Sequence, residues 1–197
     1  MEDIYTLQTN QILYPKLDPL FSQFPIQTER SDYFVFIGRL VTFSKQVDII
    51  IHAFNENGHK LIIIGSGPDE HYLQSIAWPN IEFLGRIADP EKRCEIIWKA
   101  CWLVNITMES FGYVTAESLC LGTPVLGYIK WATKEIIADC RDALLVRKQN
   151  WILIEKQTVD CLLKWITEFK NQTRDYHNIA KQAREKFTFS NLKFELK

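Results

Sequence analysis

The sequence predicts an α/β protein built on one doubly wound parallel sheet. Short apolar segments rich in β-branched and aromatic residues alternate along the chain with stretches of helical periodicity. Most of these apolar segments are hydrophobic throughout, as expected when helices cover both faces of a parallel sheet. Strands that alternate with helices in this way form successive βαβ units, which wind into a parallel sheet.

The strand and helix candidates follow one another in order from residue 33. The strand candidates are residues 33–37, 61–64, 81–84, 103–106, 124–126 and 143–146. Helical patterns separate them at residues 46–57, 69–77, 90–100 and 113–121, with a shorter one near 134–138. Asp89 and Pro90 open one of these helices in the order expected for an N-cap and a first helical residue.

The two ends of the chain differ from this body. Residues 1–30 contain three prolines and no clear period, which predicts an arm or an interdomain linker. Residues 158–170 and 174–186 have helical patterns, and the first of them carries an apolar stripe that predicts packing on the sheet. We therefore expect a ligand-binding domain over residues 31–186 and a C-terminal tail over residues 187–197.

Charge and composition limit the classes of function. Lys and Arg number 23 and Asp and Glu number 24, which gives a net charge of −1. This balance argues against sequence-independent nucleic-acid binding, which needs an excess of positive charge. No segment approaches the roughly 20 apolar residues of a membrane span, the first residues lack the pattern of a secretory leader, and the five cysteines contain no C-x-x-C pair. We expect a cytoplasmic protein without a transmembrane segment; a peripheral position at a membrane stays open.

Three loops follow strand candidates at the edge where ligands bind open parallel sheets. The first places Arg39 and Lys45 close to the start of a helix. Cations are unfavourable there because a helix N-terminus carries partial positive charge. A bound diphosphate would remove the conflict by accepting hydrogen bonds from both side chains and from nearby amides. The alternative is a pair of solvated surface cations.

The second loop is Gly65-Ser66-Gly67-Pro68. It begins like a dinucleotide-binding fingerprint, but Glu70 occupies the place of the third glycine, so the fingerprint fails. The loop is therefore interpreted as a tight turn with close backbone approach, and a nicotinamide-binding domain is disfavoured. Further along, Arg86 and Ile87 follow another strand candidate and could line the same crevice.

The third loop runs from Glu109 to Glu117. If a helix begins near Gly112, its first free amides point towards an anion site, and Glu117 lies in its second turn. The two carboxylates would then flank the anion and accept hydrogen bonds from sugar hydroxyls. The alternative is that both glutamates serve as helix caps or surface charges.

These loops together resemble a known family. Residues 109–126, ESFGYVTAESLCLGTPVL, resemble the E-x7-E signature of group 1 retaining glycosyltransferases with the GT-B fold. Upstream, FIGRL with Lys45 resembles the phosphate-binding loop of that family, and IIGSGP and FLGR resemble its next two crevice loops, in the same order. Residues 12–18, ILYPKLD, resemble the strand that enters the donor domain. The resemblance covers nearly the whole chain and implies a Rossmann-like domain, the C-terminal half of a GT-B fold.

The resemblance implies a role for each matched position. Arg39 and Lys45 would neutralise the diphosphate of a nucleotide-sugar donor, Glu109 would contact the transferred sugar, and Glu117 would hold the ribose. The other implied donor-binding residues are Gly38, Arg86, Ile87, Ser110, Phe111, Gly112, Tyr113 and Val114. The resemblance implies no metal and no cofactor beyond the donor substrate. The sequence itself offers only four scattered histidines and no compact metal cluster.

Some features depart from the family pattern. The chain reads GYIKWATKE at residues 127–135, where a glycine pair is common, and DCRDA at residues 139–143, where a D-G-x-x-G-like turn is common. These departures leave the donor base and sugar open. A GT-B enzyme also needs an N-terminal acceptor domain, which is missing from this chain, so we expect either a separate partner domain or self-association. Aromatic residues near the two ends could supply the contact surface: Phe21, Phe24, Phe187, Phe189 and Phe194.

The sequence is compatible with two functions. The first is the donor domain of a glycosyltransferase that moves a sugar from a nucleoside diphosphate to an acceptor with retention of configuration. The second is a stand-alone module that binds a nucleotide sugar without catalytic activity of its own.

Overall fold

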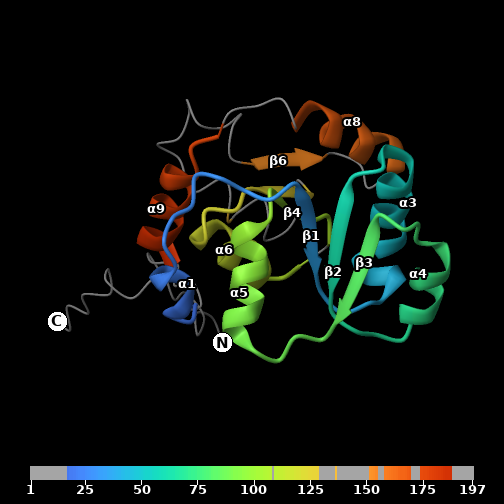
Figure 1. Ribbon diagram of the computed structural model, residues 1–197, viewed down its shortest axis with the longest axis horizontal. Helices are drawn as coiled ribbons and strands as arrows, with labels where there is room; N and C mark the ends of the chain where they lie inside the picture. Colours follow the sequence, from blue (N-terminus) through green and yellow to red (C-terminus); the bar gives the residue numbers. More distant parts are fainter. Residues whose placement is uncertain are drawn as a thin grey trace, which may run out of the picture.

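A six-stranded sheet forms the centre of the molecule in a computed structural model that describes residues 17–107, 109–128, 136, 151–154, 158–169 and 174–187 (Figure 1). The strand order is β3-β2-β1-β4-β5-β6, and every neighbouring pair is parallel. The strands are β1 (Tyr33–Ile37), β2 (Lys60–Ile64), β3 (Ile81–Gly85), β4 (Trp102–Asn105), β5 (Val125–Tyr128) and β6 (Trp151–Ile154). The prediction of an α/β fold with a doubly wound parallel sheet is confirmed. Because β1 has β2 on one side and β4 on the other, the winding reverses between β1 and β4.

Helices cover both faces of this sheet. One face packs against α3 (Val47–Asn57), α4 (Glu70–Ile76) and α8 (Val159–Phe169). The other packs against α1 (Leu20–Gln23), α5 (Pro90–Lys99), α6 (Tyr113–Cys120) and α9 (Tyr176–Phe187). Successive side chains of β1 point to opposite faces of the sheet, so Phe34 and Phe36 lie in the first core and Val35 lies in the second. The apolar stripe predicted for residues 158–170 is confirmed, because Leu162 and Ile166 of α8 are fully buried in the first core.

The strands predicted at 33–37, 61–64, 81–84, 103–106 and 124–126 are confirmed with small shifts of their ends. Strand β6, four residues long, was not predicted from the sequence. The strand predicted at 143–146 lies outside the described residues, as does the helix predicted near 134–138 apart from the buried Ile136. At the start of α5 the Asp89 side chain accepts from the amide of Glu91 at 2.9 Å, which confirms the predicted N-cap.

The described part of the N-terminal arm packs firmly on the domain. Leu17 and Phe21 are 4% and 2% exposed and belong to the second core. Arg30 donates to the carbonyl of Trp98, to Thr123 Oγ1 at 2.8 Å and to the carbonyl of Leu121 at 3.1 Å. These bonds tie the segment before β1 to the end of α5 and to the turn after α6.

The prediction that aromatic residues near the two ends form a contact surface is therefore wrong for two of them. Phe21 is buried in the core, and Phe187 is also buried there at 3% exposure. Phe24 is half-buried and meets the ring of Trp98 edge to face. Phe189 and Phe194 lie outside the described residues.

Candidate functional site

A pocket of about 390 Å³ opens at the carboxyl ends of β1, β2 and β3. This is the edge of the sheet at which the sequence analysis placed the ligand crevice. Its walls come from the loops that follow these three strands and from α5. The lining residues are Ile37, Gly38, Arg39, Ile64, Gly65, Ser66, Arg86, Ile87 and Arg93.

Close backbone packing shapes the loops after β1 and β2. A Cβ atom added to Gly65 would lie 1.9 Å from the carbonyl oxygen of Gly38, and one added to Gly67 would lie 2.2 Å from that of Leu40. The amide of Leu40 donates to the carbonyl of Ser66 at 3.1 Å. These contacts confirm the interpretation of the second loop as a tight turn with close backbone approach. They also fix the backbone that carries Arg39.

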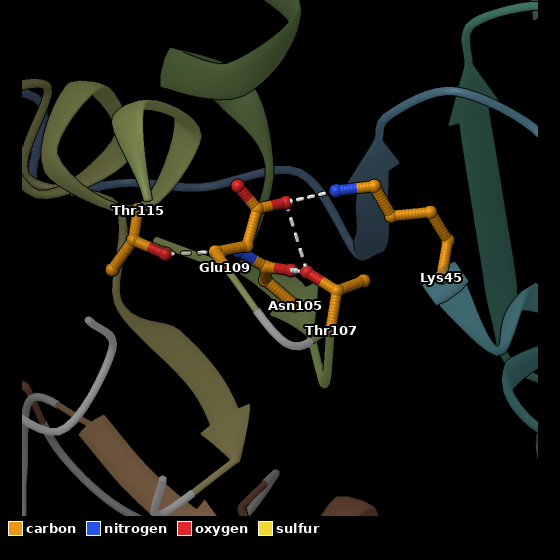
Figure 2. A network of polar contacts seen from close by, with 5 residues as sticks. All are labelled: Lys45, Asn105, Thr107, Glu109 and Thr115. Atoms are coloured by element: carbon orange, nitrogen blue, oxygen red, sulfur yellow. Dashed lines mark hydrogen bonds and ion pairs between the residues drawn. The ribbon is translucent and has the colours of Figure 1, made fainter. Parts of the chain in front are cut away.

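A carboxylate further stiffens the loop after β1. Asp69 Oδ2 accepts from the amide of Thr42 at 2.6 Å and from Thr42 Oγ1 at 2.7 Å. Both hydrogen bonds stabilise the charged form, so they lower the pKa of Asp69. The short helix α2 (Thr42–Lys45) follows, and its last residue, Lys45, points across the sheet towards the loop after β4 (Figure 2).

Three arginines line the pocket: Arg39, Arg86 and Arg93. Within the described part of the chain, Arg39 and Arg86 form no ion pair, while Arg93 Nη2 lies 3.6 Å from Glu117 Oε1. The sequence analysis proposed the first two and missed Arg93. One signal could have revealed it: Arg93 lies one helical turn before the fully buried Ile97, so a cation shares the core-facing side of α5.

Lys45 and Glu109 meet above the ends of β1 and β4, where the winding of the sheet reverses (Figure 2). Lys45 Nζ forms an ion pair and hydrogen bond with Glu109 Oε1, and Thr107 Oγ1 lies 3.0 Å from the same oxygen. Thr107 Oγ1 is also 2.6 Å from Asn105 Oδ1, and Asn105 Nδ2 donates to Thr115 Oγ1 at 3.0 Å.

This network links the loop after β4 to both neighbouring elements. Asn105, Thr107 and Thr115 are buried, so their hydrogen bonds are shielded from water. The network therefore holds the Glu109 carboxylate in place between the loop after β1 and helix α6. Sequence reasoning missed the two threonines and the asparagine, because no local pattern distinguishes them from ordinary strand-end residues.

Helix α6 begins as the sequence analysis expected, directly after Gly112. Gly112 has a φ of +79°, and a Cβ atom there would approach Ile136 Cδ1 to 3.1 Å, so both conformation and space favour glycine. No side chain of the described residues caps this N-terminus, which leaves the amides of Tyr113 and Val114 open to an anion. Ser110 and Tyr113 are exposed beside it, and the rings of Phe111 and Tyr113 meet edge to face.

Glu117 lies in the second turn of α6, as predicted, with a side chain that is only 13% exposed. Burial raises the pKa of Glu117, the nearby Arg93 guanidinium lowers it, and Asp18 adds a smaller upward contribution. The structure therefore forms two cation–carboxylate pairs at this edge, Lys45 with Glu109 and Arg93 with Glu117. Lys45, Glu109 and Glu117 are not among the residues that line the pocket itself. Glu117 pairs with Arg93, which is one of the lining residues.

Two further observations concern classes of function. Among the described residues, no three His, Cys, Asp or Glu side chains gather closely enough to hold a metal ion. No helix in the described ranges is long and apolar enough to cross a membrane.

A parallel doubly wound sheet with a cationic pocket at the carboxyl ends of its strands defines a Rossmann-like ligand-binding domain. The chain belongs to the glycosyl transferases group 1 family, whose model matches residues 31–164. No curated protein sequence gives a match.

Solved glycosyltransferase structures share the fold. A TarM variant from S. aureus, solved with fondaparinux, alpha-GlcNAc-glycerol and UDP, is 17% identical with a TM-score of 0.67 over 83% of this chain and 34% of its own. WaaG, involved in lipopolysaccharide biosynthesis, is 20% identical with a TM-score of 0.66 over 89% of this chain and 51% of its own. HepE from Anabaena, solved with UDP and glucose, is 16% identical with a TM-score of 0.64 over 88% and 50%. The chain thus corresponds to one Rossmann-like half of a GT-B glycosyltransferase and spans about a third to a half of these proteins.

Proposed function

We propose that this domain binds the nucleoside diphosphate-sugar donor of a glycosyltransferase that transfers the sugar with retention of configuration. One observation carries the proposal: Arg39, Arg86 and Arg93 come from three different elements and line one pocket. The largely buried carboxylate of Glu117 pairs with one of them, Arg93. Arg39 and Arg86, which form no ion pair within the described residues, lie at the carboxyl edge of the sheet and suit a diphosphate, since each can form charge-assisted hydrogen bonds to its oxygens.

The diphosphate end of the donor would lie between Arg39 and the start of α6. The two arginines without an ion pair in the described residues, Arg39 and Arg86, together match the double negative charge that a diphosphate ester carries. Its departure from the sugar is favoured by donors that are already oriented, because no reorganisation is needed as charge develops. We propose that Arg39, Lys45 and the amides after Gly112 perform this task without a bound metal ion.

The sugars of the donor would lie on either side of the diphosphate. Glu117 would accept hydrogen bonds from the ribose, beside a base that contacts Arg86 and Ile87. Glu109 would accept hydrogen bonds from the transferred sugar: both of its hydrogen bonds within the described chain use Oε1, which leaves Oε2 for the ligand. Departure of the diphosphate and attack by the acceptor hydroxyl would then take place on one face of that sugar.

We propose that another protein surface presents the acceptor. Phe43, on α2 beside Lys45, is 92% exposed, and Tyr113 at the start of α6 is 49% exposed. Exposed aromatic rings on the two helices that follow β1 and β4 suit a surface that another protein covers. We propose that a separate acceptor domain, or a second copy of the chain, completes the site.

Titration calorimetry with UDP, GDP and ADP tests the donor site. Arg39→Ala and Glu117→Ala should each weaken binding of the preferred nucleotide by roughly 10- to 100-fold, the loss expected for a hydrogen bond to a charged group. Lys60→Ala is the matched control, since Lys60 begins β2 at the amino end of the strand, away from the pocket, and its ion pair among the described residues is with Glu82. Nucleotide binding that is unchanged in the presence of EDTA would support the proposal that no metal ion is needed. Unchanged affinity in both site variants would refute the assignment.

A further inference from the structure

Arg93 differs from the other two arginines of the pocket. It lies on α5, and its guanidinium is the one that reaches a carboxylate, Glu117 Oε1, at 3.6 Å. The family resemblance assigned no role to this position. Arg93 therefore bridges the pocket wall and the carboxylate proposed to hold the ribose.

The environment of Arg93 fixes it in this place. Its guanidinium lies over the ring of Phe21, 5.8 Å from the ring centroid, and Phe21 is buried in the core. Its Nε is buried and has no hydrogen-bond partner among the described residues. Packing rather than hydrogen bonding thus orients the side chain, and Glu117 is its one polar contact within the described part of the chain.

Arg93 favours the charged form of Glu117. Its side chain is largely buried, and burial raises its pKa. Among the described residues, the titratable or charged groups that face it are Arg93 and Cys94 on α5 and Asp18 before α1. Among these only Arg93 favours the carboxylate, because Asp18 is itself negative and burial raises the pKa of the Cys94 thiol to about 12.

The charge state of Glu117 decides what it can recognise. A carboxylate accepts only, and it can take hydrogen bonds from both hydroxyls of a ribose at once. A protonated carboxyl group loses part of that acceptor capacity and offers a donor instead. With Oε1 facing Arg93, Oε2 is left for the sugar.

We propose that Arg93 is a positioning residue that holds the Glu117 carboxylate ionised and oriented towards the ribose, so that the pocket selects ribonucleotides over 2′-deoxyribonucleotides. This inference rests on the proposed function, because it needs the nucleotide in this pocket. It differs from a direct phosphate contact, which would strengthen ribo- and deoxyribonucleotide binding equally.

The test compares UDP, GDP and ADP with their 2′-deoxy counterparts, and with inorganic pyrophosphate, by calorimetry at pH 6 and pH 8. Wild-type protein should prefer the ribonucleotide by roughly tenfold, about one hydrogen bond to a charged group. Arg93→Met should reduce that preference to about twofold or less. The loss should be larger at pH 6 than at pH 8, because the variant lacks the cation that lowers the pKa of Glu117. Arg93→Lys should restore most of the preference. Lys92→Met, one residue away and exposed, is the control and should match wild type.

The outcomes separate the possible roles. Equal weakening of ribonucleotide, deoxyribonucleotide and pyrophosphate binding by Arg93→Met would show a phosphate contact and overturn the inference. A lower melting temperature with an unchanged ribo-to-deoxy ratio would show a structural role and overturn it as well. If wild-type protein binds no nucleotide, the proposed function fails together with this inference, whereas binding with an unchanged ratio refutes the inference alone.

Discussion

Replacing Gly65 with alanine should strongly destabilise the protein, because two loops of the site pack backbone to backbone at this residue. Gly65 has a φ of +142°, and an added Cβ atom would lie 1.9 Å from the carbonyl oxygen of Gly38. The Gly65 amide also donates to the carbonyl of Gly85 at 2.8 Å, so the residue is held from the other side. A methyl group can therefore be accommodated only if the loop that carries Arg39 moves.

The structure sets the size of the effect. Overpacking that displaces backbone costs about 1–3 kcal/mol, and an unfavourable φ for a residue with a Cβ atom costs a further 1–3 kcal/mol or so. We expect a total near 4 kcal/mol. Gly58 supplies the matched control: its φ is +70°, but nothing lies within 4 Å of an added Cβ atom. Gly58→Ala should therefore cost only the conformational part, about 1 kcal/mol.

Urea unfolding of wild type, Gly65→Ala and Gly58→Ala measures both costs. The free energy of unfolding should be lower for Gly65→Ala than for Gly58→Ala by about 3 kcal/mol. Nucleotide affinity should also fall in Gly65→Ala alone, since Gly38 and Arg39 line the pocket. Equal free energies of unfolding for the two variants would refute the inferred close approach of the loops.

Two further predictions concern stability. Gln46 is the one non-glycine residue with a positive φ in the described chain, +49°. Gln46→Gly should have a free energy of unfolding about 1 kcal/mol higher than that of Gln46→Ala, because glycine adopts this conformation without strain. Equal free energies of unfolding in urea would contradict this prediction. Glu117 has a pKa raised above its ordinary value of 4.5 by burial, so its contribution to stability is present below that value and is lost as pH rises through the folded-state pKa. Glu117→Gln should therefore melt at a higher temperature than wild type at pH 7 and at nearly the same temperature at pH 4. If the variant melts below wild type at pH 7, the pKa of Glu117 is not raised on folding.

Local patterns were enough to predict much of the fold. The apolar run of β1, the Asp89–Pro90 helix start and the stripe of α8 each depend on neighbours in the sequence, and the structure contains all three. The strand β6 was missed because its four residues have no pattern that distinguishes them from a short apolar turn. Only pairing with β5 identifies it, with Val125 opposite Trp151.

Contacts across the fold account for what the sequence did not reveal about the site. Lys45 and Glu109 were proposed separately, but their pairing joins residues 64 positions apart and follows from the adjacency of β1 and β4. In the sequence, Arg93 does not differ from an ordinary cation of a surface helix. Its role depends on the contact of α5 with α6, which brings it to Glu117. Phe21 belonged to an arm without periodicity, yet its ring is buried in the core and packs against Arg93.

A crystal structure with a bound nucleoside diphosphate tests the central claim most directly. We expect phosphate oxygens within hydrogen-bond distance of Arg39 and of the amides that open α6, with the ribose hydroxyls on Glu117. A nucleotide seated elsewhere, or one whose ribose faces away from Glu117, would contradict it.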